Sequence, residues 1–357
     1  MKRIKRYGIW LLAVLLFTSC ASENPVSAPP TEAVSKETKT PESEALYLSL
    51  ASCGNWTDSP QGIILAEQLE KLEEQSGGLV KIRSYDRYRL GDDVRVVHGV
   101  RLGTLDMIQS VPGSQTSAIP EAALLEVPGL FDSLDQWNEF LAGPYLDVMR
   151  EYYSAAGIKL LAVFACSYRE LSSDREVVTP QDLKGLRVRV IENAYHEAFW
   201  NSLGAQAVPY SFEELRFCLQ EGIAQGQENP IGTLLAENLM DLQTTITITK
   251  HMPMIYVLAM NEDRFESLTE EQEKFIMGFA DDLREELIRQ MPEREEQVLE
   301  TLRNDYGLQV VEPSKELKEM FRQGGNVVLD LLRKNLGDEK VDEMLAEAEK
   351  VRTSSQP

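Results

Sequence analysis

From Ala45 onward the chain alternates between short apolar runs that fit strands and longer amphipathic runs that fit helices. Ser59-Pro60 begins the first helix and Gly77-Gly78 ends it, as expected of a polar N-cap, a first-turn proline and terminal glycines. Strands are predicted over 46–51, 80–85, 105–109, 158–164, 187–191, 244–249 and 255–260. Repeated strand–helix units predict an α/β fold with largely parallel sheets, whose ligands bind in loops after the strands.

The first 44 residues carry their own signals. Four of the first six residues are basic, and the apolar run over 9–17 is too short to span a bilayer but fits a signal peptide. Small residues precede Cys20. The pattern predicts a signal peptide over 1–19 and lipidation of Cys20, with an ordinary cleaved signal as the alternative. Residues 20–44 are rich in Pro, Ser, Thr and Glu and are predicted to be a lipid-anchored flexible tether.

Composition and motifs exclude several function classes. The chain has 36 Lys and Arg against 58 Asp and Glu, a net charge of −22 that argues against a nucleic-acid partner. Its three histidines form no HExxH pair, and no GxSxG, Walker or GxGxxG motif is present. The sequence therefore predicts a protein that is not an enzyme and that needs no metal or cofactor.

The cysteines beyond Cys20 are Cys53, Cys166 and Cys218. No two of them have metal-ligand spacing, and three thiols cannot all close into disulfides within one chain. Each is flanked by apolar residues, so buried free thiols are predicted.

Two arginines stand out in one predicted strand. Arg187 and Arg189 are two positions apart and share a face of the strand, while Val188 and Val190 point the other way. A buried arginine is costly unless it emerges into a polar cleft, where its planar fork can bind a carboxylate through two hydrogen bonds. Spacing alone leaves two readings open: a solvent-exposed edge, or a carboxylate anchor.

The segment over 183–193, Leu-Lys-Gly-Leu-Arg-Val-Arg-Val-Ile-Glu-Asn, resembles the hallmark of the solute-binding proteins of TRAP (tripartite ATP-independent periplasmic) transporters. Further blocks resemble that family in the same order, over 90–93, 100–107, 126–131, 179–185, 203–213, 226–230 and 249–251. Gly129 and Gln225 depart from the family pattern, which leaves the shape of their loops open.

The resemblance implies a two-lobed α/β fold like that of periplasmic binding proteins, with hinge strands and a long helix that spans both lobes. The helical run over 269–305 is assigned as that helix. The implied units are lobe I over 45–166 with 255–294 returning to it, lobe II over 167–254 with 295–350 returning to it, and a disordered tail over 351–357.

The resemblance also assigns site residues. Arg189 matches the carboxylate-binding arginine of the family, and Arg169 matches a second ligand-facing arginine. Asn229 matches an asparagine whose amide donates to the ligand or orients it. Ser110 lies in a loop of the opposite lobe that is expected to approach the ligand. Asn193 is expected either to line the site or to cap a helix.

The implied function is that of an extracytoplasmic receptor, anchored to the cell membrane. It would capture a small organic carboxylate between closing lobes and deliver it to the membrane subunits of a TRAP transporter. Alternatives are the binding subunit of another transporter or sensor, or a secreted hydrolase or lyase that acts on acidic substrates. Dicarboxylates, sugar acids, sialic acids and amino-acid-like solutes all fit an arginine anchor, so the acid stays open.

Overall fold

The computed structural model describes residues 45–52, 54 and 57–354. The predicted signal peptide and tether, and with them Cys20, lie outside the described residues, as does Cys53. Among the residues that are described, none of the helices combines the length and the apolar character needed to cross a bilayer.

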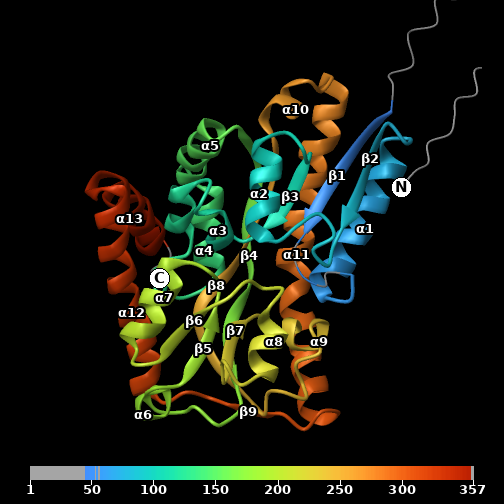
Figure 1. The fold of residues 1–357 in the computed structure, drawn as a ribbon. Helices are drawn as coiled ribbons and strands as arrows, with labels where there is room; N and C mark the ends of the chain where they lie inside the picture. Colours follow the sequence, from blue (N-terminus) through green and yellow to red (C-terminus); the bar gives the residue numbers. More distant parts are fainter. Residues whose placement is uncertain (1–44, 53, 55–56, 355–357) are drawn as a thin grey trace, which may run out of the picture. The chain divides into compact units, whose positions relative to one another are not determined.

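Nine strands form one mixed sheet (Figure 1), in the order β2-β1-β3-β8-β4-β7-β5-β6, with β9 paired to β8. The strands are β1 Leu46–Ser52, β2 Val80–Tyr85, β3 Met107–Ser110, β4 Ile158–Ser173, β5 Arg187–Val190, β6 Gln206–Pro209, β7 Gly226–Asn229, β8 Thr245–Asn261 and β9 Gln309–Val311. Strands β1–β3 are parallel to one another, and so are β5–β7. The predicted parallel sheet is therefore present as two parallel groups, which we call the first half (β1–β3) and the second half (β5–β7).

The helices cover both faces of this sheet. They are α1 Pro60–Gln75, α2 Asp93–Arg101, α3 Pro112–Gln115, the 3-10 helix η1 Pro120–Leu125, α4 Leu134–Ala142, α5 Tyr145–Ala155, α6 Pro180–Leu183, α7 Ala194–Ser202, α8 Leu215–Gln220, α9 Gly232–Ala236, α10 Glu262–Glu266, α11 Glu270–Asn304, α12 Lys315–Leu336 and α13 Asp338–Ser354. In Figure 1, α11 runs along one side and α12 and α13 along the other.

The two halves are joined by β4 and β8, which are 16 and 17 residues long. They pair antiparallel over almost their whole length and so link the halves: β8 pairs with β3 of the first half and also with β9, and β4 pairs with β7 of the second half. One of their register shifts lies between Ala165 and Ser167, which pair with Ile255 and Met254. The lobe boundaries predicted at 166/167 and 254/255 face each other at this irregularity, which supports them as a proposal because such bulges bend a strand locally.

Two predicted strands form a single strand in the structure, and a turn divides one long helical run into two helices. The runs over 244–249 and 255–260 belong to one continuous strand, and His251 between them is buried and bonded, with its Nδ1 2.7 Å from Thr249 Oγ1. The run over 134–155, whose amphipathic pattern is helical almost throughout, forms two helices, α4 and α5, separated at Gly143-Pro144.

The predicted spanning helix over 269–305 is present as α11, with Thr269 as N-cap and Asp305 as C-cap. Thr269 and Gln272 form a capping box, which satisfies two backbone amides that a helix start would otherwise leave unbonded. Ile276, Leu283 and Leu287 are buried at helical spacing against α1 and β4. Farther along, α11 also contacts α9 in the second half, so one rigid element supports both halves.

The C-terminus is more ordered than predicted. Helix α13 continues through Ser354, so residues 351–354 of the predicted disordered tail over 351–357 are helical, and that part of the prediction is wrong. Val351 packs in the core that α12 and α13 share with α4 and α5, and Arg352 donates from Nε and Nη2 to the Leu130 carbonyl at 2.9 and 2.6 Å. These tertiary contacts keep residues 351–354 helical although the surrounding sequence is polar and charged.

The predicted thiol state holds for the two cysteines that the structure describes. Cys166 and Cys218 are buried and free. Burial raises the pKa of both thiols, so they stay protonated and unreactive at neutral pH.

Glu295 is a buried carboxylate within α11. Its two oxygens accept hydrogen bonds from the Gly232 amide at 3.3 and 3.4 Å, at the start of α9. Burial raises the pKa of Glu295 to about 7, although bonds from the Gly232 and Ile231 amides work in the opposite direction.

Two helical glycines provide a matched test of packing. A Cβ at Gly325 in α12 would collide with the Pro128 carbonyl oxygen, whereas one at Gly278 in α11 would meet nothing within 4 Å. Gly278→Ala should stabilise the protein by about 0.5–1 kcal/mol, because alanine is the better helix former. Gly325→Ala should destabilise it by about 1–3 kcal/mol through overpacking. Urea denaturation measures both, and equal effects would contradict the close approach of α12.

Glu295→Gln should change how stability depends on pH. The ordinary pKa is 4.5 and the folded one about 7, so the unfolded chain loses this proton first and stability falls as pH rises across that window. The variant lacks this decline, and its stability relative to wild type should rise by at most about 3 kcal/mol over the window. Urea titrations on either side of the window, with the exposed neighbour Glu296→Gln as control, measure this; a pH-independent difference would exclude a titrating Glu295.

Candidate functional site

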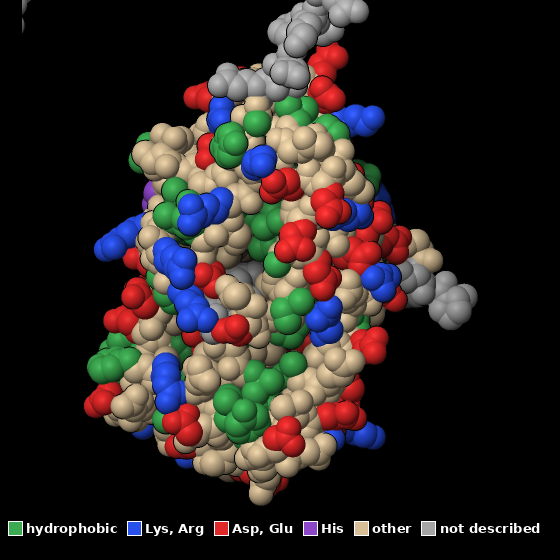
Figure 2. Space-filling view, turned by 90° about the vertical axis from the view of Figure 1, so that its right-hand side faces the viewer, with side chains coloured by type: hydrophobic (Ala, Val, Ile, Leu, Met, Phe, Trp, Pro, Cys, Tyr) green, Lys and Arg blue, Asp and Glu red, His purple; other side chains and the backbone are tan. Residues whose placement is uncertain are grey.

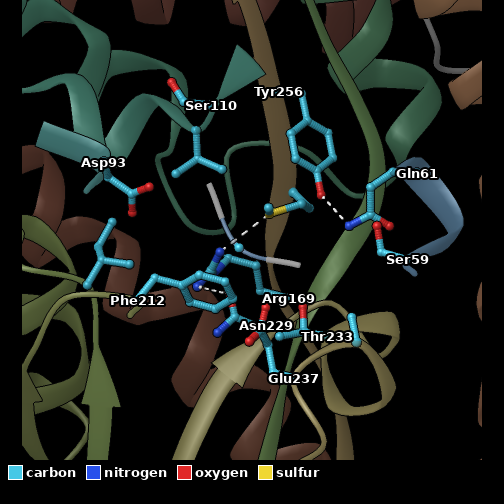
Figure 3. Close-up of a pocket in the computed structure, with 15 residues that line it drawn as sticks. Ser59, Gln61, Asp93, Ser110, Arg169, Phe212, Asn229, Thr233, Glu237 and Tyr256 are labelled. Carbon is cyan, nitrogen blue, oxygen red and sulfur yellow. Dashed lines mark hydrogen bonds between the residues drawn. The ribbon is translucent and has the colours of Figure 1, made fainter. Parts of the chain in front are cut away.

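A cavity of about 620 Å³ lies where the two halves of the sheet meet (Figure 3). Ser59, Gln61 and Ser110 line it from the first half, and Asn229 and Thr233 from the second. The crossing strands contribute three further side chains, Arg169, Met254 and Tyr256. Figure 3 shows Ser110 on the side of the cavity opposite Asn229 and Thr233. The cavity thus brings together three of the predicted site residues: Ser110, Arg169 and Asn229.

An adjoining cavity of about 740 Å³ contains the fourth, Arg189. It shares Asp93, Ile191 and Phe212 with the first cavity and is also lined by Ser114 and other residues of the α2 and β5 regions. The two cavities are therefore neighbouring parts of one cleft, with the Phe212 ring on the wall that they share.

Arg189 is fully buried on β5 and only partly bonded. Its Nε and Nη2 donate to the Tyr210 carbonyl at 3.1 and 2.6 Å, whereas Nη1 has no hydrogen-bond partner among the described residues. The guanidinium carbon lies 5.7 Å from the centre of the Phe212 ring. Burial lowers the pKa of Arg189 to about 10, so the group keeps its charge at neutral pH. An unbonded nitrogen on a buried cation is costly unless an anion joins it.

Arg169 is equally buried but is already paired within the chain. Its Nε lies 2.5 Å from Glu228 Oε2, and its Nη2 donates to Glu228 Oε1 at 2.9 Å and to Asn229 Oδ1 at 3.0 Å. Its Nη1 lies 3.4 Å from the Met254 sulfur, its one hydrogen-bond contact among the described residues. Burial opposes ionisation of Glu228, but the Arg169 charge holds the pKa of this carboxyl well below its usual range. The Arg169 side chain therefore lines the cavity while it is already paired with Glu228.

The amides and hydroxyls of the cavity are held in place by neighbours. Asn229 donates from Nδ2 to Gln227 Oε1 at 2.7 Å while its Oδ1 accepts from Arg169. Ser110 Oγ accepts from Gln115 Nε2 at 2.6 Å. These bonds fix the orientation of both groups before any ligand arrives.

Asn193 lies outside both cavities and acts as a helix cap. Its Oδ1 accepts from the Tyr195 and His196 amides at the start of α7, at 2.8 and 3.3 Å. Its Nδ2 donates to the Gly113 carbonyl at 2.8 Å, on the first-half side. Of the two roles expected from the sequence, the structure shows the cap.

Sequence reasoning missed several side chains that shape the cleft. Glu228, the partner of Arg169, lies directly before Asn229 in the segment over 226–230, and Asn229 was the residue of that segment predicted to lie in the site. Tyr256 lies in an apolar run, and nothing local separates it from a core residue, although its hydroxyl accepts from Gln61 Nε2 at 3.2 Å. Phe212 had a signal that could have been used, since it lies in the loop between β6 and α8, and ligands of such sheets bind in loops after the strands.

Comparison with known proteins gives a consistent picture. Residues 55–335 match DctP, the bacterial extracellular solute-binding protein family 7. Solute-binding proteins of Verminephrobacter eiseniae and Roseobacter denitrificans are 31% and 30% identical over 61% and 59% of this chain. The matches span 66% and 65% of those two proteins, just under two thirds of their length. The 2,3-diketo-L-gulonate-binding periplasmic protein YiaO of Escherichia coli is 26% identical over 78% of this chain and 85% of its own.

Solved structures confirm the predicted fold. A TRAP periplasmic solute-binding protein from Desulfovibrio salexigens with bound orotic acid has a TM-score of 0.80 at 19% identity, over 85% of this chain and 99% of that one. The sugar acid binding protein DctPAm from Advenella mimigardefordensis, in complex with galactonate, has a TM-score of 0.80 at 24% identity, over 86% and 99%. The family match shows that the chain belongs to family 7 of the bacterial extracellular solute-binding proteins, as its motifs predicted, and is a solute-binding protein rather than an enzyme.

Proposed function

We propose that this protein is the receptor of a TRAP transporter and that it captures a small organic acid with Arg189 as the carboxylate anchor. One observation carries the proposal: Arg189 is fully buried, charged, and has an Nη1 without a hydrogen-bond partner among the described residues. A ligand carboxylate supplies the missing acceptor and the missing negative charge at once.

Sugar acids are the ligand class that the cleft supports best. Relatives with such ligands include the 2,3-diketo-L-gulonate-binding protein of Escherichia coli and structures with bound galactonate and L-gulonate. Beyond Arg169, the cavity of about 620 Å³ is lined by the hydroxyls of Ser59, Ser110 and Thr233 and the amide of Asn229. These groups can exchange hydrogen bonds with several hydroxyls of a ligand chain.

Ligand capture is proposed to close lobe I onto lobe II about β4 and β8. Closure requires that the ligand interact more favourably with the closed state than with the open one. A carboxylate on Arg189 does so, because closure removes water and strengthens the charge-assisted bonds. Arg169 then contributes through its remaining Nη1 and through its hold on Asn229.

The membrane-embedded subunits of the transporter are the proposed partners. The family places the protein outside the cytoplasm, and a diacyl group on Cys20 would keep it close to those subunits. Acidic and basic side chains are interspersed over the face that Figure 2 shows, so the excess of acidic residues does not form a patch of one sign there.

Arg189→Ala should weaken binding of a sugar acid at least tenfold, because a charge-assisted hydrogen bond to a buried anion contributes about 1.5–3 kcal/mol. Calorimetric titration with a panel that includes galactonate and gulonate measures this. The matched control is Arg187→Ala: this arginine is in the same strand, but it donates to the Ile223 and Gly222 carbonyls and lines neither cavity. Absence of binding to any acid of the panel, or equal affinities of both variants, would contradict the proposal.

Lipidation is tested separately by expressing the full chain in a bacterial host. The wild type should fractionate with membranes and gain the mass of a diacylglyceryl group, whereas Cys20→Ala should lose both properties. A wild type that is released into the soluble fraction with an unmodified N-terminus would show that the signal is an ordinary cleaved one.

A further inference from the structure

His196 lies between two carboxylates that come from different parts of the chain. Its Nε2 is 3.4 Å from Glu126 Oε2, and its Nδ1 is 3.4 Å from Glu228 Oε1. All three side chains are buried. A neutral imidazole carries one N–H and can donate to only one of these oxygens, whereas an imidazolium can donate to both.

The contact between His196 and Glu126 crosses the predicted lobe boundary. Glu126 follows η1 in the stretch assigned to lobe I, and His196 is on α7 in lobe II. Two further contacts join the lobes at this place. Asn193 donates to the Gly113 carbonyl, and a Cβ on Gly113 would collide with the Ile191 side chain and come within 2.7 Å of Glu126 Oε2. This junction is close-packed only while the lobes are together.

Among the described groups around His196, the imidazole itself is the one that can serve as a cation for Glu126. Strand β7 presents Glu228, β4 presents Arg169, and β8 presents His251 and the apolar Met252. The apolar neighbours are Ala123 of η1 and Val328 of α12. Helix α7 contributes Asn193 and Tyr195. The Tyr153 hydroxyl of α5 is near Glu126. Arg169 is committed to Glu228 by two hydrogen bonds. Among the described residues, Glu126 has an ion pair with His196 alone.

We infer that His196 and Glu126 form a latch between the lobes and that closing the lobes takes up a proton at His196. The inference rests on the proposed function, because it assumes that the lobes open. In the closed state an unprotonated His196 would leave the buried Glu126 carboxylate without an ion-pair partner among the described residues, while Arg169 stays paired with Glu228, and this is unfavourable. In an open state the same groups would reach water, and the imidazole would return to its ordinary behaviour.

The direction of the pH effect follows from this arrangement. Burial lowers the pKa of His196, but the Glu126 and Glu228 carboxylates outweigh it and raise the pKa above 6.5 in this structure, where His196 contacts both. The latch is therefore fully present below the ordinary histidine pKa and is lost as pH rises through the raised value. Ligand affinity should fall in the same direction, because binding and closure are linked.

Calorimetry in buffers of different ionisation enthalpy tests the latch, since the dependence of the binding enthalpy on the buffer counts protons. The probe is whichever of galactonate and gulonate binds more tightly. We expect the wild type to take up protons on binding above neutral pH and to bind roughly tenfold more weakly near pH 9 than near pH 6. In His196→Gln and in Glu126→Gln both effects should be lost or strongly reduced.

His98→Gln is the matched control, because His98 on α2 lies near Ser117 Oγ and forms no ion pair with a described carboxylate. It should keep the proton uptake of the wild type. Binding that is independent of pH, or uptake that persists in His196→Gln, would overturn the latch and leave the proposed function standing.

A second measurement needs no ligand and keeps the latch testable if none of the acids binds. Small-angle X-ray scattering of the ligand-free protein should give a larger radius of gyration near pH 9 than near pH 6, as the lobes separate. His196→Gln should show no such change. Equal radii for the wild type at both pH values would overturn the latch, whereas failure of all acids to bind would count against the proposed function alone.

Discussion

The antiparallel pairing of β4 with β8 is the constraint on which the rest of the structure depends. Both halves of the sheet attach to this pair, β3 and β9 on β8 and β7 on β4. The same pair places Arg169, Met254 and Tyr256 in the cleft, so the elements that connect the halves also build the site between them. Two of its three register shifts lie where polar side chains enter the strands, near Ala165 and Arg169. A long strand pair can bend at such irregularities without losing its ladder, which suits a receptor that closes around a ligand.

The two buried arginines of the cleft differ in one respect that decides their roles. Arg169 is matched by Glu228, a neighbour that the chain supplies, and this pair is complete without a ligand. Arg189 has the Tyr210 carbonyl as its hydrogen-bond acceptor among the residues that the structure describes, and its Nη1 stays unbonded there. A buried ion pair contributes little net stability but is costly to break, so in the proposed mechanism Arg169 keeps its pairing with Glu228 and offers only Nη1 to the ligand. A buried charge without a counter-ion instead makes the empty cleft less favourable than the occupied one, which is what a receptor requires.

Much of the fold could be predicted from local patterns, because N-caps, glycines that end helices and apolar periodicity depend on residues that are close together in the sequence. The spanning helix over 269–305 is an example, since Thr269 and Gln272 have the spacing of a capping box, which indicates where a helix begins. The pairing of Arg169 with Glu228 could not be predicted, because it joins side chains 59 positions apart through the order of strands in the sheet. The same holds for the ordered end of α13, whose Val351 is held by tertiary packing rather than by its local sequence. Arg189 was ambiguous by spacing and became specific only through the motif around it.

A crystal structure of the protein with the acid that it binds most tightly tests the central claim most directly. The account predicts a carboxylate of the ligand within hydrogen-bond distance of Arg189 Nη1, on the side of the cleft that Phe212 borders, with the Arg169–Glu228 pair intact. A ligand whose carboxylate lies elsewhere, with Arg189 Nη1 still unbonded or bonded only to water, would contradict it. So would a ligand that displaces Glu228 from Arg169, because Arg169 would then be the anchor.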